Sequence, residues 1–179
     1  MVASLAGVLF ALSFEPVGLW FLAPISYALF LRICQKGEHL YRRAFLFGFI
    51  SSAVTLWWAS KYVGLIPLFF LALLHGLFYL PLGLVGRYTK NIFWFIPALL
   101  AIEAARSLFP FDGFSWMRIA FSQAEAPYAS VISIGGALLL SAWVLAISSI
   151  VVKFEEKLAF PLLLVIVLPL LLNNSYSSQ

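Results

Sequence analysis

Long apolar runs separated by short charged loops constrain the fold of this 179-residue chain more than any other feature. Hydrophobic residues make up 64% of the sequence and charged residues 10%, which is far more apolar than an ordinary soluble domain. A water-soluble protein of this length could not bury that much apolar surface in one core. We therefore predict an all-α fold, a polytopic bundle of transmembrane helices. The apolar runs cover residues 2–14, 17–33, 44–58, 63–86, 91–109, 129–152 and 159–172.

The predicted number of spans is about seven. Several runs are shorter than the roughly 20 residues that cross a bilayer core upright, and the first and last runs are the weakest. Residues 2–33 could instead form one span with a broken start, which would give six. No internal repeat or soluble domain is visible. We therefore predict a single transmembrane domain over residues 1–172, followed by a polar tail over residues 173–179.

The segment FEPVGLW, from Phe14 to Trp20, favours a hairpin between the first two runs. Pro16 disfavours helical angles at Glu15, and Gly18 permits a turn. Trp20 suits a membrane–water interface. The two runs are therefore predicted to be separate antiparallel helices.

The basic residues are distributed unequally between the two sets of loops. Three alternate loops hold eight of them: Arg32, Lys36, Arg42, Arg43, Arg87, Lys90, Lys153 and Lys157. The opposite loops hold two basic residues, Lys61 and Arg118, beside Glu15, Asp112 and Glu125. Cytoplasmic loops carry the excess of Lys and Arg, so the first set is predicted to be cytoplasmic. The segment 103–123 and the C-terminus are then both predicted to face outside.

The segment EAARSLFPFDGFSWMRIAFSQ, residues 103–123, is the strongest candidate for function. Glu103 and Arg106 occupy neighbouring positions on one helix face, inside an apolar run where ionisable groups are costly. One interpretation is mutual neutralisation, with Arg106 snorkelling toward the headgroups. The other is that Arg106 holds a lipid phosphate or a partner's carboxylate, supported by Trp116 and Arg118. For Asp112 we favour a simple turn.

His75 lies inside the fourth run and is more simply explained by hydrogen bonding within the bundle than by catalysis. Gly76, Gly83 and Gly86 are small residues that let helices approach closely. Trp57 and Trp58 are predicted to belong to the outer aromatic belt or, alternatively, to line a groove for an acyl chain.

The remaining chemistry is sparse. Two histidines on opposite sides and the lone Cys34 do not make a metal site of the usual kinds, so no cofactor is predicted. Ser115 is not in a G-x-S-x-G elbow, and we find no complete catalytic set. The basic residues act as topology signals, so we do not predict nucleic acid as a partner.

Several of these motifs resemble the membrane domain of bacterial apolipoprotein N-acyltransferase. They are FEPVGLW, which is most similar to actinobacterial members, the tryptophan pair, and E-x-x-R…G-F-x-W…SQ followed by Ile134-Gly135-Gly136. The resemblance covers nearly the whole chain. Where the family usually has GFPW, this sequence has Ser115 in place of the proline. The residues that match the membrane motif are Phe14, Pro16, Glu103, Arg106, Gly113, Phe114, Trp116, Ser122 and Gln123.

The resemblance implies seven spans in the inner membrane, followed by a periplasmic nitrilase-like domain and a final span. It also implies a reaction at the outer face, with a phospholipid and a lipoprotein N-terminus as partners. An acyl chain is first carried on a cysteine as a thioester and then passes to the α-amine of the lipoprotein's diacylglyceryl-cysteine. The family's Glu–Lys–Cys catalytic set belongs to the nitrilase-like domain, so we assign no catalytic residue here. The chain is expected to be the membrane half of such an acyltransferase.

Two sets of residues are therefore predicted to matter. The lipid- and substrate-side motif consists of Glu103, Arg106, Gly113, Phe114, Trp116, Arg118, Ser122 and Gln123. The structural motif consists of Phe14, Pro16, Trp20, Trp57 and Trp58.

Two other functions remain open. Some actinobacterial relatives associate with a polyprenol-phosphate mannose synthase, so the chain could be a non-catalytic scaffold for such a glycosyltransferase. That role would depend on the basic loops 34–43 and 87–90. A small transporter is the weakest alternative, because no inverted repeat stands out.

Overall fold

Helices make up all the regular structure in the part of the chain that the computed structural model describes, residues 1–36, 39–110 and 113–153. This confirms the predicted all-α fold. The α-helices are α1 (Val2–Ala11), α2 (Leu22–Lys36), α3 (Leu40–Thr55), α4 (Ser60–Val63), α5 (Leu65–Tyr79), α6 (Pro81–Tyr88), α7 (Phe95–Arg106) and α8 (Ile132–Lys153). Short 3-10 helices are η1 (Trp57–Ala59), η2 (Ile92–Trp94), η3 (Ile119–Gln123) and η4 (Ala129–Val131).

Two of the described helical segments are long and apolar enough to cross a bilayer, Leu65–Tyr88 and Ala129–Lys153, each with a mean hydropathy of 2.1. They match the predicted runs 63–86 and 129–152. The other described helices are shorter, so the count of about seven spans stays a prediction. The run 159–172, Lys157 and the tail 173–179 lie outside the described residues.

The first two apolar runs form separate helices that pack against each other. Between α1 and α2 the chain reverses over residues 12–21, where Gly18 has a positive φ of 67° and its N–H donates to the Phe14 carbonyl over 3.0 Å. The Ser26 hydroxyl then donates to the Ala6 carbonyl over 2.6 Å and joins the two helices. The predicted hairpin is confirmed, and residues 2–33 are not one continuous helix.

An aromatic cluster joins α1, α2, α3 and α5 in the core. The Phe30 and Phe47 rings stack with centroids 4.2 Å apart, and Phe10 and Tyr79 meet Phe47 at 6.2 and 5.3 Å. The Tyr27 and Tyr79 hydroxyls are 3.2 Å apart. These side chains are almost fully buried, so they fix the arrangement of the four helices.

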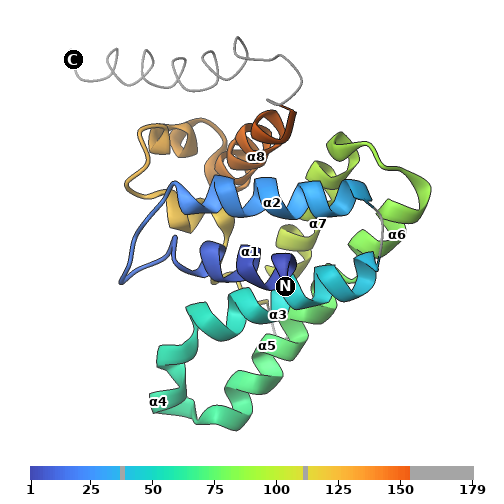
Figure 1. The fold of residues 1–179 in the computed structure, drawn as a ribbon. Coiled ribbons are helices and arrows are strands. Elements are labelled where there is room, and N and C mark those ends of the chain that lie inside the picture. The colour runs from blue at the N-terminus through green and yellow to red at the C-terminus, as the bar shows by residue number, and fades with distance from the viewer. Residues whose placement is uncertain (37–38, 111–112, 154–179) are drawn as a thin grey trace, which may run out of the picture.

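The helices α3 and α5 approach each other closely and form a hairpin that projects from the rest of the bundle, with α4 at its tip (Figure 1). A Cβ on Gly48 would lie 2.6 Å from the Tyr79 ring, and one on Gly76 would lie 2.7 Å from Phe45. The predicted role of Gly76 as a packing glycine is therefore confirmed.

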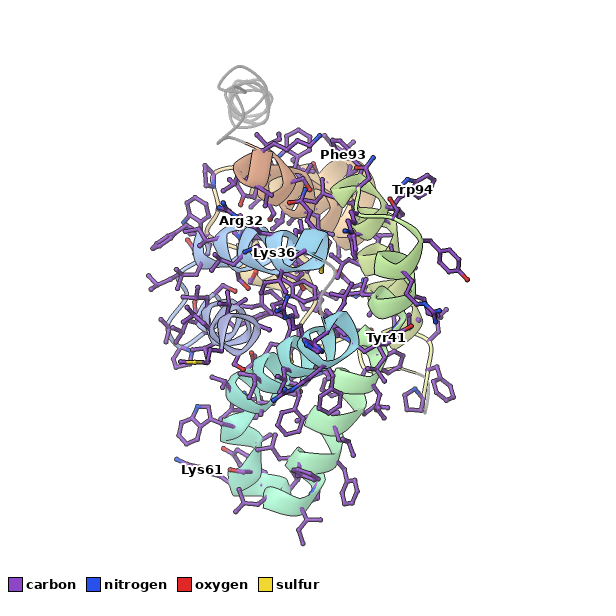
Figure 2. All side chains as sticks on the ribbon, turned by 45° about the vertical axis from the view of Figure 1, so that its right-hand side comes forward. Arg32, Lys36, Tyr41, Lys61, Phe93 and Trp94 are labelled. Atoms are coloured by element: carbon purple, nitrogen blue, oxygen red, sulfur yellow. The ribbon has the colours of Figure 1, made fainter. Side chains whose placement is uncertain are left out.

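The outer surface of this hairpin is strongly apolar. Four large side chains on the first turns of α5 are more than half exposed, namely Leu65, Ile66, Phe69 and Phe70. Side chains project outward around the bundle in the same way, including Trp94 in η2 (Figure 2). A contiguous apolar surface of this kind suits contact with lipid.

Candidate functional site

The connection between α7 and α8 folds back onto the end of α7. The Phe114 N–H donates to the Arg106 carbonyl over 2.6 Å, and the Gly113 N–H donates to the Pro110 carbonyl over 2.8 Å. Gly113 has a φ of 88°, and a Cβ there would collide with the backbone of Ser107 and Leu108. Only glycine fits this turn. Asp112, for which a turn was predicted, lies outside the described residues.

Arg106 is buried at the end of α7, with 4% of its surface exposed. Its Nη2 donates to the Trp116 carbonyl over 2.8 Å, and its buried Nε has no hydrogen-bond partner. The guanidinium therefore does not reach the surface, which differs from the predicted snorkelling. It holds the returning loop against the bundle instead.

Glu103 is equally buried and joins three segments of the chain. Its Oε1 accepts a hydrogen bond from the Ser141 hydroxyl on α8 over 2.8 Å, and that hydroxyl accepts one from the Ala120 N–H in η3 over 3.2 Å. Its Oε2 is buried without a partner. The carboxylate and the Arg106 guanidinium each hydrogen-bond to a different group, so the predicted mutual neutralisation does not take the form of a direct hydrogen bond.

Arg118 lies beside a cavity of about 320 Å³ at the end of α7. Its Nη2 donates to the Ser107 hydroxyl over 2.6 Å, and that hydroxyl donates to the Glu103 carbonyl over 2.9 Å. The lining residues are Glu103, Ala104, Ser107, Leu108, Arg118 and Leu138. Arg106 is not among the residues that line this cavity.

Gln123 is fully buried and ties the hairpin between α1 and α2 to this region. Its Nε2 donates to the Trp20 carbonyl over 3.2 Å and to the Ser122 hydroxyl over 2.7 Å. Its Oε1 accepts from the Tyr128 hydroxyl over 2.7 Å, and the Trp20 and Tyr128 rings meet edge to face at 5.8 Å. Burial raises the pKa of Tyr128, which keeps its phenol protonated as the donor.

An apolar groove lined by aromatic side chains opens beside the returning loop. The Trp116 ring stacks between Trp58 and Phe114, with centroid distances of 5.9 and 6.1 Å, and Phe114 contacts the His75 ring at 5.4 Å. The groove has a volume of about 280 Å³. It is lined by Leu56, Trp58, Ala59, Tyr62, Val63, Leu71, Phe114 and Trp116.

The two neighbouring tryptophans face different surroundings. Trp58 lines the aromatic groove, whereas Trp57 is 57% exposed and lies under the Lys61 ammonium, 5.7 Å from the ring centroid. The alternative of a groove-lining role thus fits Trp58, and the interface role fits Trp57.

The structure brings six predicted site residues to one end of α7: Glu103, Arg106, Gly113, Phe114, Trp116 and Arg118. Ser122 and Gln123 lie deeper, and of the structural motif Phe14 packs on Phe10 while Pro16 is exposed. The sequence did not single out Ser107, Ser141 or Tyr128. A polar residue such as Ser141 inside an apolar run was the available signal.

Metal binding has no support in the described residues, where no group of three His, Cys, Asp or Glu side chains is close enough to hold an ion. Several buried polar atoms nevertheless lack partners near the motif: His75 Nε2, Glu103 Oε2, Arg106 Nε and Arg118 Nε. Two of these residues contact the groove lining, because the His75 ring meets Phe114 and Arg106 donates to the Trp116 carbonyl.

Comparison with known proteins gives a consistent family. A family model described as the apolipoprotein N-acyltransferase N-terminal domain matches residues 6–150. The chain is 29% identical to an apolipoprotein N-acyltransferase of Aquifex aeolicus over 165 residues, which cover 86% of this chain and 36% of that protein. It is 30% identical to one of Azotobacter vinelandii over an alignment of 193 residues, covering 96% and 37% respectively. The chain spans little more than a third of the length of these relatives.

Proposed function

The chain belongs to the apolipoprotein N-acyltransferase N-terminal domain family, and on that premise we propose that it is the lipid-handling membrane domain for phospholipid-to-lipoprotein N-acyl transfer. Its role in this proposal is to bind and orient the acyl donor and the lipoprotein N-terminus. The groups that make and break bonds come from a nitrilase-like domain.

The observation that carries this proposal is the aromatic groove next to the buried polar cluster. An acyl chain needs hydrocarbon walls, and each methylene removed from water contributes about 0.8 kcal/mol. The groove beside Trp58, Phe114 and Trp116 supplies such walls. The cavity beside Arg118 supplies a guanidinium that suits a phosphate or carboxylate. Tail and headgroup of one phospholipid could then be held at the same end of the bundle.

Location in the bacterial inner membrane, with this end facing outside, belongs to the same proposal. Two long apolar helical segments support membrane insertion. Sidedness rests on the distribution of charge, because the loops near the groove carry few basic residues. Lys61 lies at the tip of the α3–α5 hairpin, well away from Arg32 and Lys36 (Figure 2).

A deletion and complementation experiment tests the function. The gene encoding this chain, at its full natural length, is deleted, and the N-termini of lipoproteins are analysed by mass spectrometry. We expect diacylated lipoproteins with a free α-amine to accumulate, and the wild-type gene to restore the third acyl chain. Unchanged acylation after deletion would remove the proposal.

Two neighbouring variants test the groove in the same assay. Trp58→Ala removes a groove wall, so we expect it to lower N-acylation about tenfold, as the loss of one aromatic wall of a lipid site would. Trp57→Ala is the matched control, because this exposed side chain does not line the groove. Equal activity of the two variants, at equal protein levels, would argue against the groove as the acyl site.

A further inference from the structure

A second apolar groove lies on α7, away from the aromatic groove. Its volume is about 600 Å³, and it lies between α7 and the junction of α5 with α6. The residues that line it are Leu74, Leu77, Phe78, Pro81, Ala98, Ala101, Ile102, Ala105 and Phe109. None of them belongs to the predicted site motif, and none lines the aromatic groove.

The wall that α7 contributes consists largely of small residues. Ala98, Ala101 and Ala105 recur every three or four residues along one stripe of the helix. Ala101 and Ala105 are each two residues from Glu103, which bonds to Ser141 on α8, so they point about 200° away from that contact. Alanines at this spacing let another helix approach closely in a membrane. Because Ala101 and Ala105 are exposed, no described part of the chain covers the stripe.

The described structure stops close to the start of α7. The last residue of α8 is Lys153, and its Nζ lies 4.1 Å from the centroid of the Phe93 ring in η2, just before α7 begins. The next five residues are FEEKL, in which three charged side chains favour water over hydrocarbon. Five extended residues reach at most about 17 Å, which exceeds the roughly 10 Å diameter of a helix. The chain can therefore pass the start of α7 and reach its other face.

The apolar run 159–172 has the composition and length that the groove requires. Between Pro161 and Pro169 it reads LLLVIVL, without a polar side chain. A helix over these seven residues is about 10 Å long, and the stretch from Ala98 to Ala105 on α7 covers about the same distance. The whole run is shorter than the roughly 20 residues that cross a bilayer upright, so it gains from packing against protein.

We propose that residues 162–168 pack into this groove as a helix parallel to α7, and that this part of the chain covers Ala101 and Ala105. Residues beyond 172 then emerge near Phe109, at the start of the returning loop and beside the candidate site. The inference does not depend on the proposed acyl transfer, because it concerns only how the chain packs.

Disulfide cross-linking in isolated membranes tests this packing. The full-length protein carries Cys34→Ala, which removes the native thiol of the described chain, and Ala101→Cys is combined in turn with a cysteine substitution at each position from 162 to 168. After oxidation and denaturation, free thiols are counted by their gel shift with maleimide-polyethylene glycol. We expect cross-links at two or three positions spaced three or four residues apart, since only those Cα atoms come within the roughly 7 Å that a disulfide allows.

Ala146→Cys is the matched control. Ala146 is a half-buried alanine on α8 that does not line the groove, and it precedes Lys153 by about the distance at which Ala101 follows Phe95. With the same seven partners, it should form about tenfold less disulfide than Ala101→Cys, because a disulfide does not bridge distant Cα atoms. Equal or stronger cross-linking of Ala146→Cys would place the run on α8 and overturn the proposal.

Two further results of this experiment would identify a different occupant. A cross-linked dimer on the gel would mean that a second copy fills the groove. Free thiols in every pair with Ala101→Cys would mean that lipid covers the alanines. Either result would overturn the proposal.

A substitution that fills the groove gives an independent measurement. Ala101→Leu adds bulk where the run packs, so Tm in detergent should fall by about 5 °C. At a position that faces only lipid or detergent, the same change should alter Tm by less than about 2 °C. A shift that small would contradict the packing of 162–168 against α7.

Discussion

At the scale of single residues, Arg106 is a buried charged side chain that holds the returning loop. Its guanidinium is buried and donates to the Trp116 carbonyl, close to the Glu103 carboxylate that is hydrogen-bonded to Ser141. Removing one member of a buried charged group leaves the others without compensation. Arg118 is only half-buried and lies at a cavity, where water can replace it.

We therefore expect the two arginines to differ in stability. Arg106→Ala should lower the free energy of unfolding by about 3 kcal/mol, because it leaves a buried carboxylate and carbonyl behind. Arg118→Ala should lower it by about 1 kcal/mol, the value of an ordinary hydrogen bond. Thermal or denaturant unfolding in detergent measures both. Equal, small losses would mean that Arg106 does not hold the loop.

The same residues show how far sequence reasoning reaches. An acid and a base one turn apart in an apolar run identified Glu103 and Arg106 as important, since such groups are costly in lipid. Their partners could not be predicted, because the Trp116 carbonyl and the Ser141 hydroxyl come from segments that meet only in the folded bundle. Gln123 was predicted to belong to the lipid- and substrate-side motif, and its amide is buried against Trp20 and Tyr128.

At the scale of elements, the returning loop after α7 depends on one glycine. Gly113 has a positive φ, and its Cα faces the backbone of Ser107 and Leu108 without room for a methyl group. Gly136 in α8 also has a positive φ, of 68°, but nothing lies within 4 Å of the position of a Cβ. Alanine substitutions at these two glycines therefore distinguish the cost of a strained backbone from the cost of a steric collision.

Gly136→Ala should cost about 1–3 kcal/mol, as expected for a strained backbone conformation alone. Gly113→Ala adds a collision with main-chain atoms that cannot rotate away, so we expect a larger loss and a displaced loop. Unfolding curves measure the first effect. A change in tryptophan fluorescence that is lost when Trp116 is replaced by Phe measures the second, and identical behaviour of the two variants would contradict the tight turn.

Element boundaries were predictable where the local chemistry was strong. Pro16 and Gly18 placed the reversal between α1 and α2, and the runs 63–86 and 129–152 matched long helical segments. The first of these consists of α5 and α6, and the second is kinked in α8 at Gly135 and Gly136, whose backbone angles are not helical. The short helices α4 and η1 at the tip of the α3–α5 hairpin were not predicted. The chain turns between α4 and α5 at Gly64, which has a positive φ of 85°.

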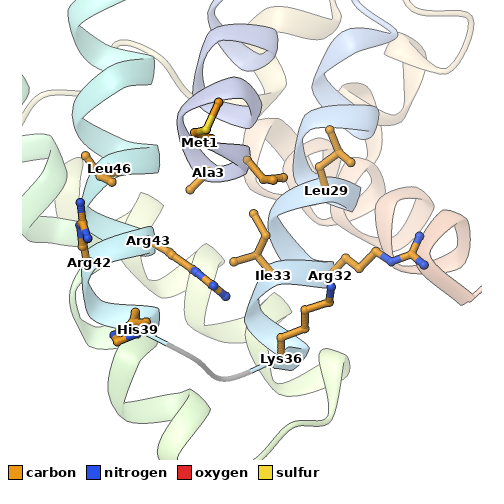
Figure 3. A pocket seen from close by; sticks show the side chains of 11 residues that line it. Met1, Ala3, Leu29, Arg32, Ile33, Lys36, His39, Arg42, Arg43 and Leu46 are labelled. Carbon is orange, nitrogen blue, oxygen red and sulfur yellow. The ribbon is translucent and has the colours of Figure 1, made fainter.

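At the scale of the whole molecule, the two ends of the bundle differ in chemistry and are separated by an apolar middle. One end holds the aromatic groove with Glu103 and Arg106, and the other holds a cavity of about 520 Å³ whose lining includes Lys36 and Arg42 (Figure 3). The opposite sides predicted for these two ends follow from the distribution of basic residues in the loops. The proposed function requires that the end with the groove faces outside.

Cysteine labelling in intact cells made permeable only at the outer membrane tests this arrangement. Cys34 is buried, so it should react little and leave a low background. A cysteine at exposed Glu125, on the same predicted side as the groove, should react with a membrane-impermeant maleimide, whereas one at exposed Lys90 should react only after lysis. The two positions are matched in exposure and differ only in predicted side. Labelling of position 90 alone in unlysed cells would show that the topology is the opposite of the predicted one. The groove would then face the cytoplasm, where the proposed transfer to exported lipoproteins could not occur.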